Sequence, residues 1–499
     1  MPQQVEPSDT PFQPKTAVAA SFAEIEKGGV QDEIADAAEL ELQRRVLRKT
    51  DLKLVPILLL LIFVAFLDRT NIGNARIMGL EAELGMKGSD YNIALFVFFI
   101  PYVTLDIPAN ILMKKLRPSL YLPTIVFCWG IVTIGMGVTK SFAGLVVCRT
   151  LLGVFEACYF PGALYLLSMY YTRYELSTRV NLWYSASVLS IAFGGLLAYA
   201  IGHMDGVGGH RPWRWIFILE GAFTVLSSCI AFYVLPDWPE QAKFLDNDER
   251  TVLLRKLAHD TKDYVETKST WEVFKDCMCD PKLLFSSLMY LGIALTGAAA
   301  AYFLPTILVE LGWTALKAQY MSIPIHMCSL MFAVLSGYLS DHFKIRSPFV
   351  IVPNFFSLLG YGLLLSHNST SVRVRYMALF FVTSGCFASI GVTVSWLNNN
   401  ILGSKRRGIS TAVLLGTGSC GSVIGSTVYL KREAPRYVTG YSVSISCVVL
   451  TQICAVGYLT YAWYENKQKS IGARNHLLEL PQDQQDALGD KHPGYRYTY

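Results

Sequence analysis

Two charged residues, Arg149 and Glu156, lie inside a long apolar stretch of residues 142–169. The stretch is long enough to cross a bilayer, which takes about 20 apolar residues. A charge near the bilayer centre costs about 2.5–3.5 kcal/mol or more, so it rarely lacks a role. Seven residues make about two helical turns, which places both side chains on one face, about 10 Å apart along the axis. An acid and a base in this setting are typical of a proton- or ion-coupled site.

A second charged pair, Asp68 and Arg69, lies in the apolar run of residues 55–75. At 1.5 Å per residue, Asp68 and Arg149 lie at similar depths, about 12 Å below the outer ends of their spans. Neighbouring residues on a helix point about 100° apart. We therefore expect Asp68 to turn to the span of Arg149 and Arg69 to face a central cavity. The alternative is a static ion pair with no part in turnover.

The guanidinium of Arg69 suits a carboxylate ligand, because it offers a planar, permanently charged fork. The apolar neighbours of Glu156 favour the protonated form of its carboxyl, whereas Arg149 favours the charged form. We expect Glu156 to take up a proton near neutral pH; the alternative is that it neutralises Arg149 permanently. The predicted proton-coupling residues are therefore Asp68, Arg149 and Glu156.

The composition indicates a polytopic membrane protein. Of the 499 residues, 52% are hydrophobic and 16% are charged, and the mean hydropathy is +0.36. Soluble domains average about 25% charged residues. The segment lengths predict an all-α membrane protein with twelve spans and exclude a barrel. The predicted spans cover residues 53–76, 92–113, 120–138, 142–168, 180–202, 213–235, 283–306, 318–340, 348–366, 375–395, 409–430 and 441–464.

The spans fall into two groups of six. A polar loop between them is expected to be cytosolic and to carry one or two surface helices. Six-helix halves around a central loop are the layout of a transporter whose substrate binds between the halves. Residues 1–25 and the tail from Glu465 are expected to be disordered. The predicted divisions are an N-terminal tail at 1–50, a six-helix bundle at 51–236, the loop at 237–282, a second six-helix bundle at 283–465 and a C-terminal tail at 466–499.

Basic residues predict the orientation of the chain. Clusters precede the first span and follow the second, eighth and tenth, so all fall on one side of a twelve-helix protein. The positive-inside rule then places both termini in the cytosol, and we expect the plasma membrane. The sequon at Asn368 falls on the outer side, as glycosylation requires. The clusters are Arg44, Arg45, Arg48, Lys49 and Lys53; Lys114, Lys115 and Arg117; Lys344 and Arg346; and Lys405, Arg406 and Arg407.

Five motifs follow one another along the chain: FLDRTNIGNAR (66–76), CRTLLGVFEACYFPG (148–162), WRWIFILEG (213–221), GYLSDHFKIR (337–346) and WLNNNILGSKRRG (396–408). Together they resemble the major facilitator superfamily and, within it, the anion:cation symporter family. The fungal allantoate- and nicotinate-permease-like branch is nearest, and the resemblance covers residues 45–465. It implies a twelve-helix fold that rocks between outward- and inward-open states and usually imports small organic anions with protons.

The resemblance also implies roles for single residues. It places the two buried charged pairs in one coupling and substrate network, and it adds Tyr102 and Trp396 to the substrate site. The chain departs from the family pattern at three places. Phe66 stands where some relatives have a tyrosine, Ser419 replaces an asparagine, and the basic turn after the second span lacks a glycine and an aspartate. The first two departures bear on the identity of the substrate more than on the mechanism.

Other polar residues near the predicted site have two interpretations each. Asp106 lies about one turn after Tyr102 and either lines the cavity or packs with Asn110. Asn399 ends the tenth span, where it binds substrate or caps the helix. Trp396 either stacks on a planar ligand or packs in the core. We retain Arg69, Tyr102, Asp106, Trp396 and Asn399 as predicted substrate-binding residues.

Four further residues are predicted to act away from the substrate. Asp341 and Arg346 are expected to tie the eighth and ninth spans together in a gating role. Glu220 is expected to anchor helices by pairing with Arg214 or with nearby backbone. His326 is expected to be a core histidine with its hydrogen bonds satisfied, rather than a proton relay.

These observations predict a secondary transporter of a small organic anion, such as a nicotinate- or allantoate-like carboxylate, working by proton symport and alternating access. The alternatives are an exporter of a fungal secondary metabolite on the same fold and a non-transporting nutrient receptor. No span carries a nucleophile–base set or a metal-ligand cluster, so we expect no enzyme, no metal and no cofactor. The expected partners are the organic anion, protons and the lipid bilayer, without nucleic acid, and the chain is expected to be a monomer.

Overall fold

The computed structural model describes residues 15–113, 116–262, 269–366, 370–480 and 489–499, and the regular structure in these ranges is helical. Short helices α9 (Asn247–Lys262) and α10 (Thr270–Met278) lie in the polar loop between the halves. The long helices are α1 (Lys15–Ala75), α3 (Asp90–Met113), α4 (Pro118–Val138), α5 (Phe142–Ala157), α6 (Tyr159–Tyr170), α7 (Arg173–Ile201), α8 (Pro212–Val234), α11 (Pro281–Glu310), α12 (Ala315–Phe343), α13 (Pro348–Leu365), α14 (Val372–Asn399), α15 (Ser404–Thr427) and α16 (Val438–Ser470).

The all-helical membrane fold predicted from the sequence is confirmed. Within the described residues, eleven helical segments are long and apolar enough to span a membrane, and α3 adds a shorter apolar stretch at Asp90–Leu105. Each predicted span overlaps one helix, except the fourth, which is divided into α5 and α6. Prolines at first helical positions begin α4, α8, α11 and α13. There the missing N–H is not needed and the ring presets the backbone angle.

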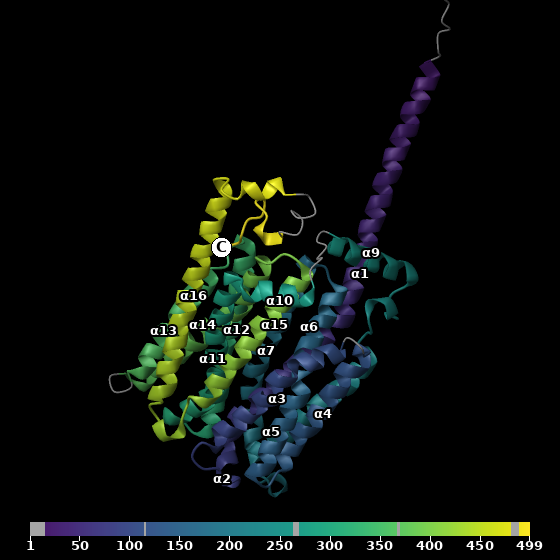
Figure 1. Cartoon of the computed structure of the whole chain (residues 1–499). Coiled ribbons are helices and arrows are strands. Elements are labelled where there is room, and N and C mark those ends of the chain that lie inside the picture. Colours follow the sequence, from purple (N-terminus) through teal and green to yellow (C-terminus); the bar gives the residue numbers. More distant parts are fainter. Residues whose placement is uncertain (1–14, 114–115, 263–268, 367–369, 481–488) are drawn as a thin grey trace, which may run out of the picture.

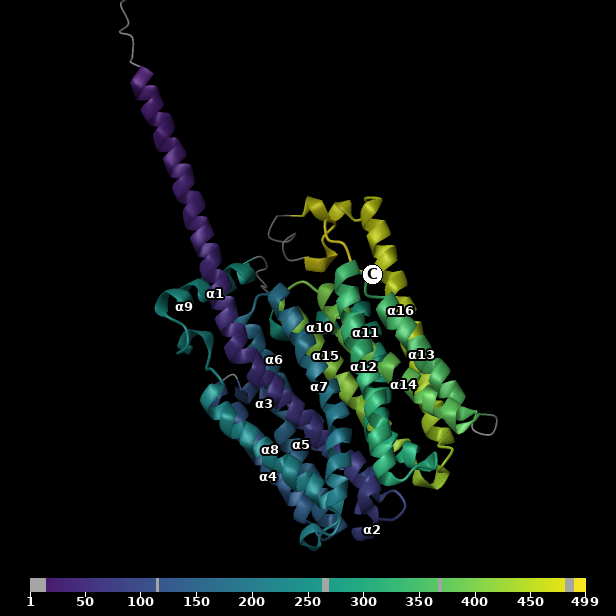
Figure 2. The same ribbon diagram turned by 180° about the vertical axis from the view of Figure 1, so that it is seen from behind.

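The helices form two bundles that meet along α7 and α12, with further contacts of α1 with α11 and α3 with α15 (Figures 1 and 2). Within the C-terminal bundle, α11 packs closely against α15. Gly421 and Gly425 of α15 face the backbone carbonyls of Leu291 and Leu295, where any Cβ would collide. These glycines therefore permit the close approach of α11 and α15.

Hydrogen bonds that join the two halves gather at one end of the molecule, next to the short helix α2 (Glu81–Glu83); we call this the α2 end. The side-chain amide of Asn92 on α3 donates to the carbonyl of Ser426 on α15 at 3.0 Å. Lys431 forms an ion pair with Glu81 across the same boundary. The halves are thus linked to one another at the α2 end.

The chain that follows α16 packs on the opposite end of the molecule, beside α9 and α10, which we call the α9 end (Figure 1). Asp490 is fully buried there, pairs with Lys282 at the start of α11 and forms a 3.0 Å ion pair with Arg406 of α15. The indole of Trp396 donates to the carbonyl of Thr498 at 3.0 Å. We call the contacts of residues 489–499 with this end of the molecule the tail seat.

The predicted disorder of the tail from Glu465 is therefore wrong for residues 465–480 and 489–499. Polar composition suggested disorder, but the tail's charged and aromatic residues find partners far away in the sequence. At the other terminus, residues 1–14 lie outside the described structure. Residues 15–25 belong to α1, which extends well beyond the bundle (Figures 1 and 2).

Candidate functional site

The fourth span is interrupted beside its buried acid. Pro161 has no N–H to donate, and its ring crowds the carbonyl four residues earlier, at Ala157, where α5 ends. Glu156 lies in the last turn of α5, and Arg149 lies two turns earlier on the same helix. Both residues are buried. The interruption of the helical hydrogen bonds therefore lies directly next to Glu156.

Arg69 of α1 forms an ion pair with Glu156. The Arg69 Nε donates to the Glu156 Oε1 at 2.7 Å, and a terminal guanidinium nitrogen pairs with the same oxygen. The Arg69 side chain is 15% exposed, whereas that of Glu156 is almost fully buried. The sequence indicated a permanent Glu156–Arg149 pair as one alternative, but the acid pairs with Arg69 instead.

Three aromatic rings surround the guanidinium of Arg69. Its central carbon lies 4.7 Å from the ring of Tyr102, 5.0 Å from that of Phe66 and 5.3 Å from that of Phe98. The rings of Phe98 and Tyr102 stack with their centroids 5.5 Å apart. Cations are attracted to ring faces within about 6 Å, so the rings stabilise the charge while leaving the edge of the guanidinium to an anion. The structure therefore brings the predicted residues Arg69, Tyr102 and Glu156 together.

Arg149 lies near this cluster without an ion pair among the described residues. Its guanidinium carbon is 6.0 Å from the ring of Phe98, and its buried Nε has no hydrogen-bond partner in the described structure. Phe98 therefore contacts both arginines. The sequence did not single out Phe98, although its position four residues before Tyr102 places both rings on one face of α3.

Asp68 does not turn to the fourth span, which corrects the expectation from the sequence. Its Oδ2 accepts hydrogen bonds from the indole of Trp129 on α4 at 3.1 Å and from the hydroxyl of Thr224 on α8 at 2.7 Å. Depth along the helix allowed contact with Arg149, but the rotation of α1 points Asp68 to the other side. Arg69, one residue on, faces Glu156, as the 100° step between neighbours requires.

Two predicted substrate residues lie far from this cluster, at the α9 end. Trp396 is fully buried, and its ring stacks on that of Tyr458 with the centroids 4.4 Å apart. The backbone carbonyl of Asn399 accepts a 2.5 Å hydrogen bond from the hydroxyl of Tyr495. Both residues belong to the tail seat in this conformation, and the structure does not bring them to Arg69.

The predicted gating residues are in contact with each other. Arg346 Nη1 lies 2.5 Å from the Asp341 Oδ1 and donates to the hydroxyl of Ser340 at 2.8 Å. The pair joins the end of α12 to the turn before α13, at the α9 end. The side chain of Asp106 and the whole of Asn368 lie outside the described part of the structure.

The hydrogen bonding predicted for two structural residues, Glu220 and His326, is wrong. Glu220 does not pair with Arg214, because Arg214 forms a 2.8 Å ion pair with Glu83. Glu220 instead accepts a hydrogen bond from the side-chain amide of Asn71. His326 is buried, but its Nδ1 has no hydrogen-bond partner in the described structure, so it is not a fully satisfied core histidine.

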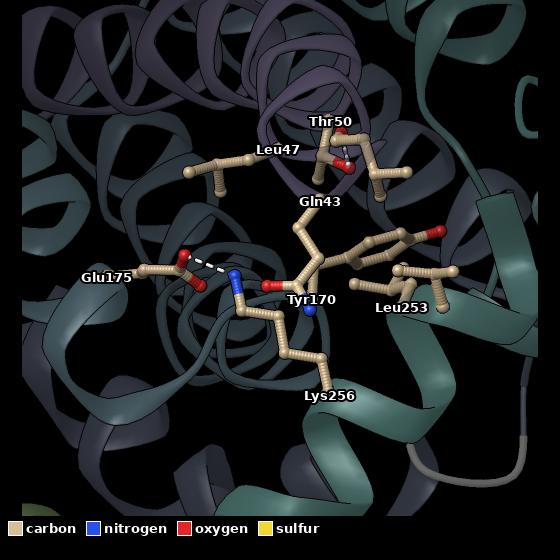
Figure 3. Close-up of a pocket in the computed structure, with 9 residues that line it drawn as sticks. Gln43, Leu47, Thr50, Tyr170, Glu175, Leu253 and Lys256 are labelled. Atoms are coloured by element: carbon tan, nitrogen blue, oxygen red, sulfur yellow. Dashed lines mark hydrogen bonds and ion pairs between the residues drawn. The ribbon is translucent and has the colours of Figure 1, made fainter. Parts of the chain in front are cut away.

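A small pocket at the α9 end is not a substrate site. It lies between α1, α6, α7 and α9, and its volume of about 10 Å³ has room for one water molecule (Figure 3). Lys256 and Glu175 form a 2.6 Å ion pair at its edge. Burial raises the pKa of Glu175, but hydrogen bonds from Lys256 and Thr172 outweigh that effect and leave the pKa below its usual range. The pocket is therefore part of a structural contact between α7 and α9, in which Glu175 and Lys256 neutralise each other.

The chain folds into two helical bundles and buries the Arg69–Glu156 ion pair between two of its spans. This combination is typical of a membrane transport protein built from two bundles. A family model of the Major Facilitator Superfamily matches residues 58–426, and the chain belongs to that superfamily.

Relatives and solved structures agree with this assignment. The chain is 33% identical to an uncharacterized transporter of Schizosaccharomyces pombe over 89% of each chain. It is 33% identical to an MFS-type transporter of Penicillium expansum over 91% of this chain and 90% of that one. It is 29% identical to a high-affinity nicotinic acid transporter of Saccharomyces cerevisiae over 97% of this chain and 90% of that one. Among solved structures, an inward-facing bacterial homolog of the human lysosomal transporter Spinster shares the fold, with a TM-score of 0.62 at 17% identity, over 81% of this chain and 95% of that one.

Proposed function

We propose that this chain is a secondary transporter of the anion:cation symporter type, which carries a small organic anion together with protons by alternating access. The ion pair between Arg69 and Glu156 carries the proposal. A permanently charged guanidinium, partly open and backed by three rings, is a binding group for a carboxylate. Its present partner is a buried carboxylate of the protein, which is the same chemistry as the proposed substrate.

The mechanism we propose is an exchange of partners at Arg69. While Glu156 is ionised, it holds the guanidinium and competes with any incoming carboxylate. A proton on Glu156 removes its charge, weakens its bond to Arg69 and frees the fork for the substrate. Substrate and proton then bind together, which is the condition for symport. Asp68 and Arg149 are proposed to modulate the charge balance around this pair.

A flat carboxylate suits the site best. The rings of Phe66, Phe98 and Tyr102 offer faces beside the guanidinium, and a planar ligand can stack on such faces while its carboxylate meets Arg69. A nicotinic acid transporter is among the relatives, which supports a nicotinate-like anion; an allantoate-like anion is the second candidate. Trp396 and Asn399 can join the site only in a conformation that releases the tail seat.

We further propose a monomer in the plasma membrane with both termini in the cytosol. The two ends of the described chain lie at the α9 end (Figure 1). The basic residues Arg45 and Lys49, which precede the first span, pair with Glu249 of α9 at the same end. The positive-inside rule makes that end cytosolic. The links between the halves at the α2 end then close the outer side, and Asp341 and Arg346 are proposed to act in gating on the inner side.

Transport by the purified protein tests the proposal. The protein is reconstituted in vesicles and offered labelled nicotinate, allantoate and simpler carboxylates, with and without an imposed pH gradient. We expect uptake of at least one anion above that of protein-free vesicles, with stimulation by the gradient and loss of that stimulation on adding a protonophore. A transported anion that ignores the gradient would contradict symport, and the absence of any transported carboxylate would contradict the substrate class.

A further inference from the structure

Two carboxyl groups, Asp68 and Glu220, are buried between α1 and α8 and form no ion pair in the described structure. Both side chains are nearly inaccessible, with Glu220 at 2% exposure. They are held by two bonds that run in opposite directions between the helices. The hydroxyl of Thr224 donates to Asp68 at 2.7 Å, and the amide of Asn71 donates to Glu220.

The spacing along each helix explains this geometry. Asp68 and Asn71 are three residues apart on α1, and Glu220 and Thr224 are four apart on α8, so each pair lies on one helix face. Each helix contributes one acid and one donor, and each donor serves the acid of the other helix. The four residues therefore form one cluster, which we call the α1–α8 cluster.

The α1–α8 cluster has too few donors for its acceptors. The Oδ1 of Asp68, the Oδ1 of Asn71 and the Oε1 of Glu220 are all buried, and none has a hydrogen-bond partner among the described residues. An unmet buried acceptor costs about 1–3 kcal/mol, and more when it is charged. Three such oxygens in one cluster indicate a missing proton donor or a missing proton.

The nearby cations do not neutralise both acids. Arg69 on α1 is paired with Glu156 of α5. On α8, Arg214 pairs with Glu83 at 2.8 Å and donates to backbone carbonyls at 2.9 and 2.6 Å.

Arg76, which directly follows the end of α1, is paired with Glu81 at 2.6 Å. Arg149 and Glu156 of α5 both act electrostatically on Asp68. Glu220 is repelled by the negative charge of Asp68. The remaining helix of the cluster, α4, contributes the neutral Trp129. Two buried acids that face each other without a dedicated cation cannot both remain ionised at acceptable cost.

We propose that the α1–α8 cluster is a proton-binding site, in which Glu220 holds the proton and Asp68 carries the charge. The donors decide between the two acids. Asp68 accepts from both Trp129 and Thr224, whereas Glu220 accepts only from Asn71. Hydrogen bonds to a carboxylate favour its charged form, so the better-served acid is the ionised one. A proton on Glu220 also supplies a donor for one of the unmet oxygens.

This site is separate from the Arg69–Glu156 pair but joined to it through α1. Asp68 and Arg69 are neighbours in sequence, and a change of charge on one side of α1 acts on the helix that carries the substrate-binding guanidinium. Any part of this bound proton in transport rests on the proton symport proposed above. As a place where a proton is bound, it stands independently of transport.

Infrared spectroscopy of the purified full-length protein tests for the proton directly, because protonated carboxyl groups have a carbonyl band that carboxylates lack. We expect this band near neutral pH in the wild type and its loss or clear decrease in Glu220→Gln. The matched control is Glu249→Gln. Glu249 is as buried, at 3% exposure, but it pairs with Lys49 at 2.6 Å, so its substitution should leave the band unchanged.

A second variant keeps the proposal open to refutation even if Glu220→Gln folds poorly. In Asp68→Asn the repulsion from the neighbouring charge is gone, so the Glu220 band should disappear at a lower pH than in the wild type. A band that is unchanged in Glu220→Gln would overturn the proposal. So would a cluster that binds sodium, seen as a band that vanishes when sodium replaces potassium at constant pH.

The two proposals fail in different ways. If the Glu220 band is present but transport does not respond to a pH gradient, the proton site is supported and symport is contradicted. Proton-driven uptake in a protein without the band would retain symport and reject the site.

Discussion

The two halves of this transporter bury charges in different ways. In the N-terminal half, Asp68, Arg149 and Glu220 lie within spans without an ion pair among the described residues, whereas Arg69 pairs with Glu156. In the C-terminal half, the described buried charges gather at the α9 end, where Asp490 meets both Lys282 and Arg406 and also accepts from the hydroxyl of Tyr497 at 3.1 Å.

The incompletely paired charges of the N-terminal half are suited to binding, whereas the fully paired charges of the C-terminal half are suited to holding helices together. A charged group that is fully paired gains little from a new ligand, so the tail seat is suited to holding α11 and α15 in one arrangement. A charged group with an incomplete set of partners is expensive to bury, and it is retained where a ligand or a proton completes the set.

Arg69→Lys is expected to have the largest effect on substrate affinity. Lysine keeps the charge but loses the bidentate fork, and charge-assisted hydrogen bonds contribute about 1.5–3 kcal/mol each, so substrate affinity should fall about 10- to 100-fold. Uptake by reconstituted protein measures it. The control is Arg179→Lys, which alters a fork that binds Asp51 at 3.0 and 2.6 Å outside the site and should leave affinity unchanged. Wild-type affinity in Arg69→Lys would remove Arg69 from substrate binding.

Glu156→Gln should separate driven uptake from exchange. Glutamine is neutral, as a protonated glutamate is, so Arg69 stays free for substrate but no proton is carried. We expect uptake driven by a pH gradient to fall to the level of protein-free vesicles, while exchange of labelled for unlabelled substrate persists. Both assays are run on the same vesicles. Full proton-driven uptake by the variant would show that coupling lies elsewhere, and the α1–α8 cluster would be the next place to look.

Asp490→Asn should loosen the tail seat without touching the substrate site. The change leaves Lys282 and Arg406 with Asp280 as their remaining acid, at 3.4 and 3.7 Å. Breaking a buried pair costs about 3–5 kcal/mol, and the remaining acid places this loss near the lower value. Hydrogen exchange of residues 489–499 should speed up strongly, whereas exchange in α1 and α5 should not change. Unaltered protection of the tail would show that its backbone bonds, not Asp490, hold it.

The contribution of Asp490 to the tail seat is expected to persist at all physiological pH values. Burial pushes the pKa of Asp490 up, but Lys282 and Arg406 outweigh burial and hold the pKa below its ordinary value, which is about 3.9. Because the pKa is lower in the folded state, the contribution to stability is complete above about pH 4 and is lost as the pH falls through the folded pKa. Proteolysis of the tail at a series of pH values measures this. Release of the tail between about pH 5 and 7 would contradict it.

Much of the fold could be predicted from the sequence, because a span is fixed by apolar length, and apolar length is local. The division of the fourth span is also local, since Pro161 is visible in the sequence. The tail seat could not be predicted. Asp490 and Lys282 are 208 residues apart, and nothing near either residue indicates the other. A polar composition describes the tail correctly and still says nothing about the partners that order it.

The site was only half predictable for a similar reason. The buried charges and Tyr102 are recognisable because charged residues in spans are rare. Their pairing depends on how far each helix is rotated, which packing decides. This is why Asp68 was expected to face α5 but lies against α4 and α8, and why Glu220 was assigned to Arg214 instead of Asn71.

Asp341→Asn is expected to have the smallest effect on stability and therefore isolates a gating role. The Asp341 side chain is 47% exposed, and exposed ion pairs contribute about 0–1 kcal/mol, so the melting temperature should hardly change. Arg346 also keeps its bond to Ser340. If the pair holds α12 and α13 together during one half of the cycle, the variant should still change the rate of turnover at saturating substrate, with substrate affinity unaltered. Reconstituted protein, assayed for the maximal rate and the half-saturating concentration, separates these outcomes. An unchanged maximal rate would leave Asp341 and Arg346 as a surface contact without a part in gating.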